Sequence, residues 1–539
     1  MRIPSLKQIA LLVGAAAVAL TSGVPADAID APNSLTVQAD QPGPVINRDI
    51  FGQFSEHLGQ GIYGGIWVGK NSKIPNVRGI RSDVVAALRA IKVPVVRWPG
   101  GCFADKYHWR QGIGPADNRA VTLNSIWGGV LEPNSFGTDE FMDFADQIGA
   151  ESYVSVNMGS GSVQEAADWL EYMTVDKPTT LGKERVANGH STPYKIKYLG
   201  MGNEMWGCGG AMTPESYVDY LKRYVMEVDS QHPDQVNIGL LQRSPHAALR
   251  VAVGDGGTGN EYTEAVMKAW KAREPWYWNI EGLSMHHYTW GESMMKSLAT
   301  GFGEKEYAGL LKETLGMEGL IAKRSAIMDQ YDPKKLVALV VDEWGVWLQA
   351  LPGLNPMFLK QQNSLRDAIA ASLNLNIFAR HADRVRMTNI AQMVNVLQGM
   401  ILTDNEKMVL TPTYYLYKMY VPFQDSQYLP ITLTSGGYNF GDVSMPQVDA
   451  IAARAKDGRI WIALTNVDPN RPADITTSVQ GTSARAAAGQ VLSAARVDTI
   501  NTFDAPNAVR PAPINAKLAG GRLVLHLPPK SVTVVSLEP

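Results

Sequence analysis

Two glutamates stand directly after apolar stretches of the sequence, where a carboxylate would emerge from the end of a buried strand. Glu204 lies in the glycine-rich segment YLGMGNEMWGCGG, and Glu343 lies in VVDEWGVW. Hydrolysis of a glycosidic bond needs two such groups, because one must donate a proton to the departing oxygen while the other, ionised, attacks or activates water. If both side chains arise from strand ends, we expect the carboxyl groups to lie about 5–5.5 Å apart, the spacing of the retaining mechanism. A salt bridge to a loop arginine is the alternative for either glutamate alone.

Other polar residues follow apolar runs in the same way. They are Glu56, His57, Arg97, Asn157, Asn203, His286, Tyr288, Asp342 and Gln392. Asn203 could donate a hydrogen bond to a sugar hydroxyl, and we expect Glu56 and Arg97 to form a buried polar pair beside the site. His286 and Tyr288 are two residues apart on a strand and so point to the same face. There Tyr288 could donate to a nucleophilic carboxylate, or it could be a core tyrosine.

These residues need a scaffold that brings strand ends together, and the sequence pattern indicates one. The predicted strands are the runs IFGQFSE, VPVVRW, SYVSVN, KIKYLGMGN, VNIGLL, IEGLSMHH, KLVALVVDE and RVRMTNIA, which begin at Ile50, Val93, Ser152, Lys195, Val236, Ile280, Lys335 and Arg384. Strands that alternate with helical patterns predict an α/β fold, a (β/α)₈ TIM barrel over residues 46–422. A doubly wound open sheet is the competitor, and the strand count favours the barrel. Active sites of such barrels lie at the carboxyl ends of the strands.

The pattern changes outside the barrel. Over residues 423–539, short alternating runs such as DGRIWIALTNV are broken by Gly, Pro, Asn and Asp, which predicts a C-terminal antiparallel β-sandwich. The segment 29–45 contains NSLTVQAD, a strand that we expect to pair into this sandwich. Residues 1–28 have the pattern of a signal peptide, with Arg2 and Lys7 before an apolar stretch and the sequence ADA at the end. We therefore expect a secreted or periplasmic protein.

The composition argues against several classes of function. Hydrophobic residues make up 45% of the chain, charged residues make up 19%, and the formal net charge is −3. This balance provides no basic surface for nucleic acid or an anionic membrane, and no later segment approaches the roughly eighteen apolar residues of a membrane span. The 13 tryptophans and 20 tyrosines suit contact with sugar rings, although core packing accounts for most of them.

Metal and cofactor sites are not indicated by the sequence. There is no H-E-x-x-H motif, and the adjacent His286 and His287 point to opposite faces of a strand. The segment GDGGTG at 254–259 is a weak match to a dinucleotide-binding loop, so we expect neither a metal nor an organic cofactor. The two cysteines, Cys102 and Cys208, both follow apolar strands in glycine-rich loops and could line one pocket. We expect free thiols, with a single disulfide as the alternative.

Four motifs occur together in the order of a known family. They are FGQFSEHLGQGIYGG, VRWPGGCFADKYHWRQGIGP, NSFGTDEFMDF and GNEMWGCGG. From about Ile46 to Tyr420 the chain resembles the family 51 glycoside hydrolases, the α-L-arabinofuranosidases. The resemblance implies a retaining exo-enzyme that removes terminal α-L-arabinofuranosyl units from arabinoxylan, arabinan or their oligosaccharides. It also implies that no cofactor is needed and that a homo-oligomer is common.

The resemblance also assigns residues to roles. It matches Glu204 to the general acid/base and Glu343 to the nucleophile. The family's substrate-binding positions correspond to Glu56, Arg97, Cys102, Trp127, Asn203, His286, Tyr288 and Gln392. At Cys102 many relatives have asparagine, and a thiol is a weaker partner for a sugar hydroxyl. Two alternatives stay open, namely an endo-glucanase or β-xylosidase on the same scaffold, and a non-catalytic carbohydrate-binding protein.

Overall fold

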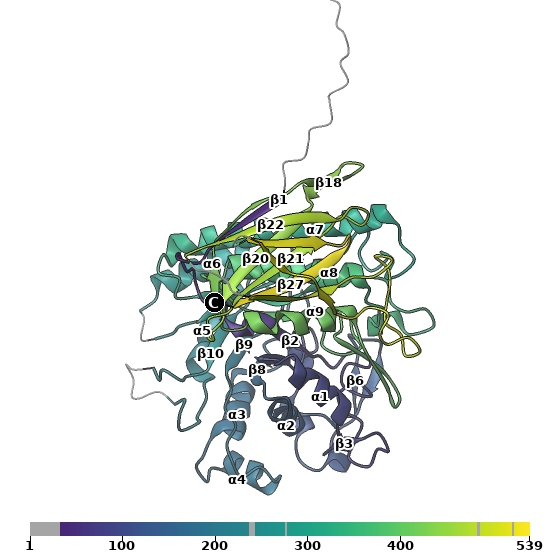
Figure 1. The fold of residues 1–539 in the computed structure, drawn as a ribbon. Helices are drawn as coiled ribbons and strands as arrows, with labels where there is room; N and C mark the ends of the chain where they lie inside the picture. Colours follow the sequence, from purple (N-terminus) through teal and green to yellow (C-terminus); the bar gives the residue numbers. More distant parts are fainter. Residues whose placement is uncertain (1–32, 237–242, 275–276, 482–485, 520–521, 539) are drawn as a thin grey trace, which may run out of the picture. The chain divides into compact units, whose positions relative to one another are not determined.

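The computed structural model describes residues 33–236, 243–274, 277–481, 486–519 and 522–538. Eight parallel strands close into a barrel in the order β10-β11-β12-β13-β2-β5-β8-β9 (Figure 1). These strands are β2 (Gly52–Phe54), β5 (Val95–Trp98), β8 (Glu151–Val156), β9 (Tyr198–Met201), β10 (Leu249–Ala252), β11 (Gly282–Thr289), β12 (Ala338–Val346) and β13 (Val385–Ile390). Their residues are almost all buried, because helices cover the outside and side chains fill the inside. The predicted TIM barrel is confirmed.

The fifth barrel strand differs from the prediction. The run VNIGLL was predicted as a strand; its first residue, Val236, lies in none, and 237–242 lie outside the described residues. The fifth strand is β10, which pairs with β9 through Arg250 and Leu199 and with β11 through Val251 and Gly282. It leads into the GDGGTG segment at 254–259.

The helices follow the strands as the barrel pattern requires. They are α1 (Ser82–Ala90), α2 (Thr138–Ile148), α3 (Val163–Thr174), α4 (Thr180–Ala187), α5 (Pro214–Glu227), α6 (Glu261–Ala272), α7 (Glu304–Tyr331), α8 (Leu365–Arg380) and α9 (Pro412–Tyr420). α2 shows why they form: Phe141, Phe144 and Ile148 recur at helical spacing and are buried, and the helix stops at Gly149, whose φ of 74° is left-handed.

Short elements fill the loops. Six single turns of 3₁₀-helix are η1 (Arg48–Phe51), η2 (Ala104–Lys106), η3 (Trp109–Gly112), η4 (Ala116–Asn118), η5 (Pro356–Phe358) and η6 (Val421–Phe423). Four two-stranded pairs are β3 (Asn76–Val77) with β4 (Ile80–Arg81), β6 (Thr122–Asn124) with β7 (Val130–Glu132), β14 (Ile401–Asp404) with β15 (Lys407–Leu410), and β18 (Gly437–Phe440) with β19 (Val443–Pro446). The turn of the β6–β7 hairpin carries Trp127.

Two sheets stack beyond the barrel, which confirms the predicted C-terminal β-sandwich. One contains β16 (Gln427–Leu429), β20 (Val448–Arg454), β21 (Ile460–Asn466), β27 (Ser531–Glu538), β23 (Ala486–Leu492) and β24 (Ala512–Ile514). The other contains β17 (Ile431–Thr434), β1 (Asn33–Gln38), β22 (Ala473–Gln480), β26 (Arg522–Leu527) and β25 (Lys517–Ala519). Leu35, Ile462, Leu525 and Val535 belong to the core between them. The N-terminal strand β1 pairs antiparallel with β17 and parallel with β22, whereas the domain boundaries themselves stay a prediction.

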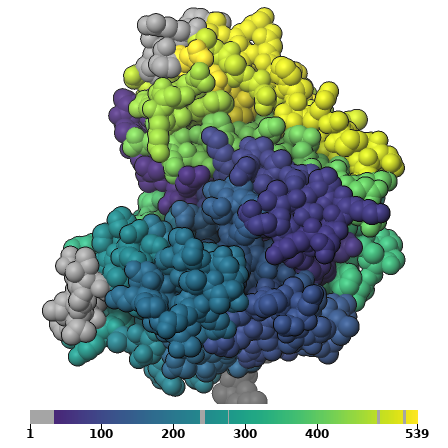
Figure 2. Space-filling model, turned by 90° about the horizontal axis from the view of Figure 1, so that it is seen from below, coloured from purple at the N-terminus to yellow at the C-terminus, as the bar shows by residue number. Residues whose placement is uncertain are grey.

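Helix α8 connects the barrel to the sandwich. All its residues from Leu365 to Ala379 are buried, although several of them are polar. Ser372 hydrogen-bonds Thr465 of β21 at 2.9 Å, and Asn376 donates to Asp449 of β20 at 2.8 Å. Figure 2 shows the green and yellow residues of the C-terminal half beside the purple and teal residues that form most of the barrel. Within the described residues, no helix is both long and apolar enough to cross a membrane.

Candidate active site

The carboxyl ends of the barrel strands enclose a small cavity. Its volume is about 100 Å³. Seven of the ten predicted site residues line it, and these are Glu56, Cys102, Trp127, Glu204, Tyr288, Glu343 and Gln392. The other three, Arg97, Asn203 and His286, form hydrogen bonds or ion pairs to lining residues or to one another. The sequence therefore identified a set of residues that the fold does bring together.

Glu343 is held by two donors at the end of β12. Arg97 donates from Nη1 to Oε1 at 2.7 Å, and Tyr288 donates from its hydroxyl to Oε2 at 2.8 Å. Burial and then the charge of Glu343 raise the pKa of Tyr288 well above its ordinary value, so the phenol keeps its proton and remains a donor. A guanidinium and a phenol on opposite oxygens fix the orientation of the Glu343 carboxyl group.

Arg97 has different partners from the one predicted. Besides Glu343, it donates from Nη2 to Asn203 at 2.7 Å and lies 3.7 Å from Asp342. Burial would lower the pKa of Arg97, but the charges of Asp342 and Glu343 raise it, so the guanidinium stays charged. Among the described residues, no hydrogen bond or ion pair joins Arg97 to Glu56. The expected Glu56–Arg97 pair is therefore wrong, because Arg97 reaches across the barrel interior rather than along its rim.

Glu56 accepts four hydrogen bonds of its own. The amides of Gly101 and Phe103 donate to Oε1 at 3.0 Å each, and Trp127 donates to it from Nε1 at 2.9 Å. Gln392 donates to the other oxygen at 3.0 Å. Burial and then the nearby charge of Glu343 raise the pKa of Glu56.

The paired glycines of WPGGC allow the two carboxylates to come close. A Cβ on Gly100 would lie 2.6 Å from Cγ of Glu56, and a Cβ on Gly101 would lie 2.7 Å from Oε1 of Glu343. Neither separation is tolerated, so a side chain at either position would displace a carboxylate. The glycines are therefore a requirement of the site itself.

Glu204 stands in a tight loop after β9. Its own φ of 40° is left-handed, which is unusual for a residue with a side chain. The loop curls over it: the amides of Gly207 and Gly209 both donate to the Glu204 carbonyl, at 2.7 and 3.2 Å. Gly209 must be glycine, because a Cβ there would lie 2.1 Å from the carbonyl oxygen of Asn203. The glycine cluster of the sequence thus serves to form this loop.

His286 links the two glutamates. Its Nδ1 lies 2.9 Å from Oε1 of Glu204 and 3.6 Å from Oε2 of Glu343, and its Nε2 lies 3.3 Å from Asp342. Burial alone would lower the pKa of His286, but Glu343, Asp342 and Glu204 together raise it to about 10. The ring is therefore an imidazolium at neutral pH, and an imidazolium donates hydrogen bonds rather than binding a metal.

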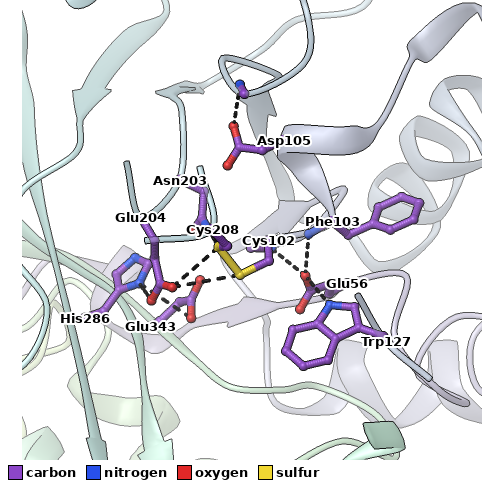
Figure 3. The surroundings of a disulfide bond; sticks show 12 residues. Glu56, Cys102, Phe103, Asp105, Trp127, Asn203, Glu204, Cys208, His286 and Glu343 are labelled. Atoms are coloured by element: carbon purple, nitrogen blue, oxygen red, sulfur yellow. Dashed lines mark hydrogen bonds and ion pairs between the residues drawn. A yellow bond between two sulfur atoms is a disulfide. The ribbon is translucent and has the colours of Figure 1, made fainter. Parts of the chain in front are cut away.

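The two glutamates meet at short range. One carboxylate oxygen of Glu204, one of Glu343 and a ring nitrogen of His286 all lie within 4.8 Å of one another. Figure 3 shows the two carboxylates turned toward each other beside the histidine. Asp342, on the other side of the histidine, is ionised: burial would raise its pKa, but Arg97 and His286 lower it.

The two cysteines form a disulfide, so the expectation of free thiols is wrong. Cys102 and Cys208 are bonded, with their Cα atoms 5.6 Å apart. Cys102 follows β5 and Cys208 follows β9, and both loops turn inward over the same cavity. The sulfur of Cys102 has no proton in this bond and cannot donate to a sugar hydroxyl.

An aromatic wall was missed by the sequence interpretation. Trp347 lines the cavity, and its ring lies 5.0 Å from that of Tyr288 and 4.6 Å from that of Trp290. Both tryptophans had a signal in the sequence, because Trp347 is four residues after Glu343 and Trp290 is two residues after Tyr288. Side chains two or four apart on an extended strand point to the same side.

A larger groove lies elsewhere on the molecule. Its volume is about 750 Å³, and its lining includes Asp139, Glu140, Glu151 and Lys195. Glu151 is the first residue of β8 and Lys195 precedes β9, so this groove is at the amino ends of the strands. Barrel enzymes place their chemistry at the opposite end, which identifies the smaller cavity as the candidate active site.

Comparison with known proteins gives consistent matches. The family model described as α-L-arabinofuranosidase 1 domain matches residues 87–300, and that described as α-L-arabinofuranosidase C-terminal domain matches 342–531. An intracellular exo-α-L-arabinofuranosidase from Bacteroides ovatus is 45% identical and aligns over 94% of this chain and 95% of its own length. The crystal structure of the GH51 arabinofuranosidase from Xanthomonas axonopodis pv. citri is 47% identical, with a TM-score of 0.89 over 94% of this chain and 100% of that one.

A more distant structure gives the same result. The α-L-arabinofuranosidase from Thermotoga maritima, solved as an arabinose complex, is 29% identical, with a TM-score of 0.81 over 94% of this chain and 100% of that one.

The expected location is corrected by these matches. The Bacteroides ovatus relative is named an intracellular enzyme, which contradicts the expectation of a secreted or periplasmic protein with a signal peptide. Residues 1–28, on which that expectation was based, lie outside the described residues. The prediction depended on a short pattern, an apolar stretch followed by small residues, and such a pattern alone is weak evidence for a signal peptide.

Fold, site and comparisons agree over nearly the whole length. The eight-stranded barrel, the carboxyl-end cavity with two facing glutamates and the C-terminal sheets occur together in one chain. The relatives at 45% and 47% identity each align over 94% of it. The chain therefore belongs to the α-L-arabinofuranosidases of glycoside hydrolase family 51.

Proposed function

We propose that this enzyme is a retaining exo-α-L-arabinofuranosidase in which Glu343 is the nucleophile and Glu204 is the general acid/base. The observation that carries the proposal is the short separation of the two carboxylates in different surroundings, with one oxygen of each within 4.8 Å. Retaining glycosidases bring their carboxyl groups close, whereas inverting enzymes leave room for a water between them.

The first step forms a covalent intermediate. The carboxylate of Glu343, oriented by Arg97 and Tyr288, attacks the anomeric carbon of the terminal arabinofuranosyl unit. Glu204 gives its proton to the glycosidic oxygen as the bond to the leaving group breaks. His286 holds Oε1 of Glu204, so Oε2 is the oxygen that carries the transferred proton.

The second step releases arabinose. Once the ester has formed, the negative charge of Glu343 is gone. Glu204, now ionised, accepts a proton from an incoming water, which attacks the anomeric carbon from the side that the leaving group vacated. Two inversions leave the product with the configuration of the substrate.

The remaining cavity residues would hold the sugar. Glu56 and Gln392 face each other across one side of the cavity and can exchange hydrogen bonds with ring hydroxyls, while Asn203 is oriented by Arg97. Trp127 provides an apolar ring surface for the sugar, and its indole N–H donates a hydrogen bond to Glu56. A cavity of about 100 Å³ fits a single terminal sugar better than the middle of a chain, which supports exo action.

The substrates that we propose are arabinoxylan, arabinan and their oligosaccharides. Proton NMR of the first-formed product should show the α-configured arabinose of a retaining enzyme, and the β-configured sugar would reject the mechanism. Matched 4-nitrophenyl α-L-arabinofuranoside and β-D-xylopyranoside should be hydrolysed with a strong preference for the first. Release of xylose alone would support the β-xylosidase alternative, and inertness on every furanoside would support a non-catalytic binding protein.

A further inference from the structure

The Cys102–Cys208 disulfide joins loops from two barrel strands that are not neighbours. Cys102 follows β5, Cys208 follows β9, and β8 lies between those strands in the barrel. The bond therefore spans the mouth of the barrel at the point where the chain emerges with Glu204. Figure 3 shows both sulfurs beside the carboxylate of Glu204.

The sulfurs contact the one oxygen of Glu204 that His286 does not hold. Sγ of Cys208 lies 3.6 Å from Oε2 of Glu204, and Sγ of Cys102 lies 3.9 Å from the same oxygen. Because the sulfurs are bonded to each other, neither carries a proton, and these are packing contacts rather than hydrogen bonds. The disulfide thus occupies the space beside Oε2 without donating anything to it.

The bond also closes the strained loop that carries Glu204. The left-handed φ of Glu204 persists only if the surrounding structure imposes it. On one side the amide of Gly207 donates to the Glu204 carbonyl, and on the other the disulfide fixes Cys208 four residues after the glutamate. The side-chain Nδ2 of Asn203, the residue directly before Glu204, lies 3.6 Å from the Cys208 sulfur.

We propose that the Cys102–Cys208 disulfide is a positioning element for the acid/base Glu204, and that its reduction by a dithiol selectively slows the proton-transfer step. The inference rests on the acid/base role proposed above. It assigns to the two cysteines a function that differs from direct contact with the sugar.

Reduction changes both the shape and the hydrogen bonding around Glu204. A dithiol reductant supplies two electrons and two protons: the Cys102–Cys208 bond breaks, two thiols form, and the reductant becomes a disulfide. The two sulfurs must then separate to a non-bonded distance. Each now carries a proton that can be donated to Oε2, and such donors stabilise the ionised carboxylate, which cannot act as an acid.

Other titratable groups around Glu204 are not altered by reduction. They are His286 and Tyr288 on β11, Glu343 on β12, and Asp105 in the loop after β5. The redox effect is therefore confined to the two sulfurs. Cys208 is exposed, so a reductant can reach the bond.

The test compares the oxidised and reduced enzyme on two substrates. A 2,4-dinitrophenyl arabinofuranoside has a leaving group that needs no proton, whereas an arabinoxylan oligosaccharide has one that does. We expect reduction with dithiothreitol, followed by removal of the reagent, to lower kcat/KM about tenfold on the oligosaccharide and less than threefold on the dinitrophenyl substrate. Reoxidation should restore the activity. The chain has only two cysteines, so no other thiol can respond.

Two variants make the outcome decisive. Cys102→Ala/Cys208→Ala lacks the positioning bond but adds no thiol donors, so it should show a substrate-dependent loss no larger than that of the reduced enzyme and no response to the reductant. Its melting temperature reports any general loosening. Equal losses on both substrates, or no loss on reduction, would overturn the inference. Glu204→Ala is measured alongside: if it has no leaving-group dependence, the proposed acid/base role fails, whereas if it has one and reduction does not, only the role of the disulfide fails.

Discussion

The two glutamates of the site are held in contrasting ways. Glu343 lies at the end of a regular strand, is 7% exposed in its side chain, and has a guanidinium and a phenol as partners. Glu204 lies in a strained glycine loop and is 19% exposed. Among the described residues its carboxylate has one hydrogen-bonding partner, His286, and a disulfide lies on its other side.

The difference matches the role that we propose for each group. A nucleophile must stay ionised and fixed while a bond forms, which suits a buried carboxylate with two strong donors. An acid/base must gain and lose a proton in each cycle and meet both the leaving group and water, which suits an oxygen at the solvent side with no fixed donor. In the proposed mechanism, the strand β12 therefore provides the nucleophile and the constrained loop after β9 provides the acid/base.

The largest effect should follow the removal of the nucleophile. Glu343→Gln keeps the volume and leaves an oxygen for Arg97, so the variant should fold, yet kcat should fall about 10⁴- to 10⁶-fold. Initial rates on 4-nitrophenyl α-L-arabinofuranoside measure the loss, with circular dichroism as the folding control. A folded variant with wild-type activity would refute the assignment.

Removal of the acid/base should give a loss that depends on the leaving group. Glu204→Ala should lower kcat about 10²- to 10⁴-fold on oligosaccharides, where the departing oxygen needs a proton. Activated aryl substrates should be affected less in the first step, and azide should accelerate their turnover by replacing the water that Glu204 no longer activates. A uniform loss with no azide effect would count against the role.

The partners of Glu343 can be tested with a matched pair of tyrosines. Tyr288→Phe removes the donor to Glu343, and Tyr153→Phe removes a similar buried donor to Asp342, also at 2.8 Å. Each should cost about 1–3 kcal/mol of unfolding free energy, measured by chemical denaturation. Only Tyr288→Phe should also lower kcat, by about tenfold, with KM little changed. Similar kcat values in the two variants would mean that the phenol of Tyr288 is structural.

Substitution of Asp105, which lies beneath the Glu204 loop, should have the smallest effect on activity. It should instead change how the stability of the protein depends on pH. Burial raises the pKa of Asp105 from 3.8 to about 7, partly offset by the amides of Met158 and Gly159. In the unfolded chain Asp105 ionises near the lower value. Its contribution to the stability of the fold is therefore complete below about pH 4 and is lost as the pH rises to 7. As the pH rises from 4 to 7, the unfolding free energy of Asp105→Asn should therefore gain about 1–4 kcal/mol relative to that of the wild type. Parallel denaturation curves for the two proteins across that range would contradict the raised pKa.

Much of this arrangement is readable from the sequence because it is local. Glu204 and Glu343 follow apolar runs, and a barrel brings all strand ends to one face. The pairing of His286 with Tyr288 follows from the two-residue period of a strand. These inferences need no knowledge of which strands are neighbours.

The features that were missed depend on long-range order. Arg97 contacts Glu343 rather than Glu56 because barrel closure places β12 across the interior from β5. The disulfide forms because the loops after β5 and β9 converge above β8. The spacing of the two cysteines in the sequence does not predict this convergence. The strand β10 is only four residues long and contains Arg250, whose guanidinium donates to the carbonyl of Val225 and lies 3.7 Å from Glu281. The more apolar VNIGLL therefore looked like the better strand.

The central claim is that Glu343 becomes covalently bonded to the sugar while Glu204 does not. Glu204→Ala should accumulate this intermediate on a 2,4-dinitrophenyl arabinofuranoside, because the first step needs no proton and the second lacks its base. Acid quenching, pepsin digestion and mass spectrometry should find one added pentosyl unit on the peptide that contains Glu343. A pentosyl unit on another residue, or none under steady turnover, would contradict the account.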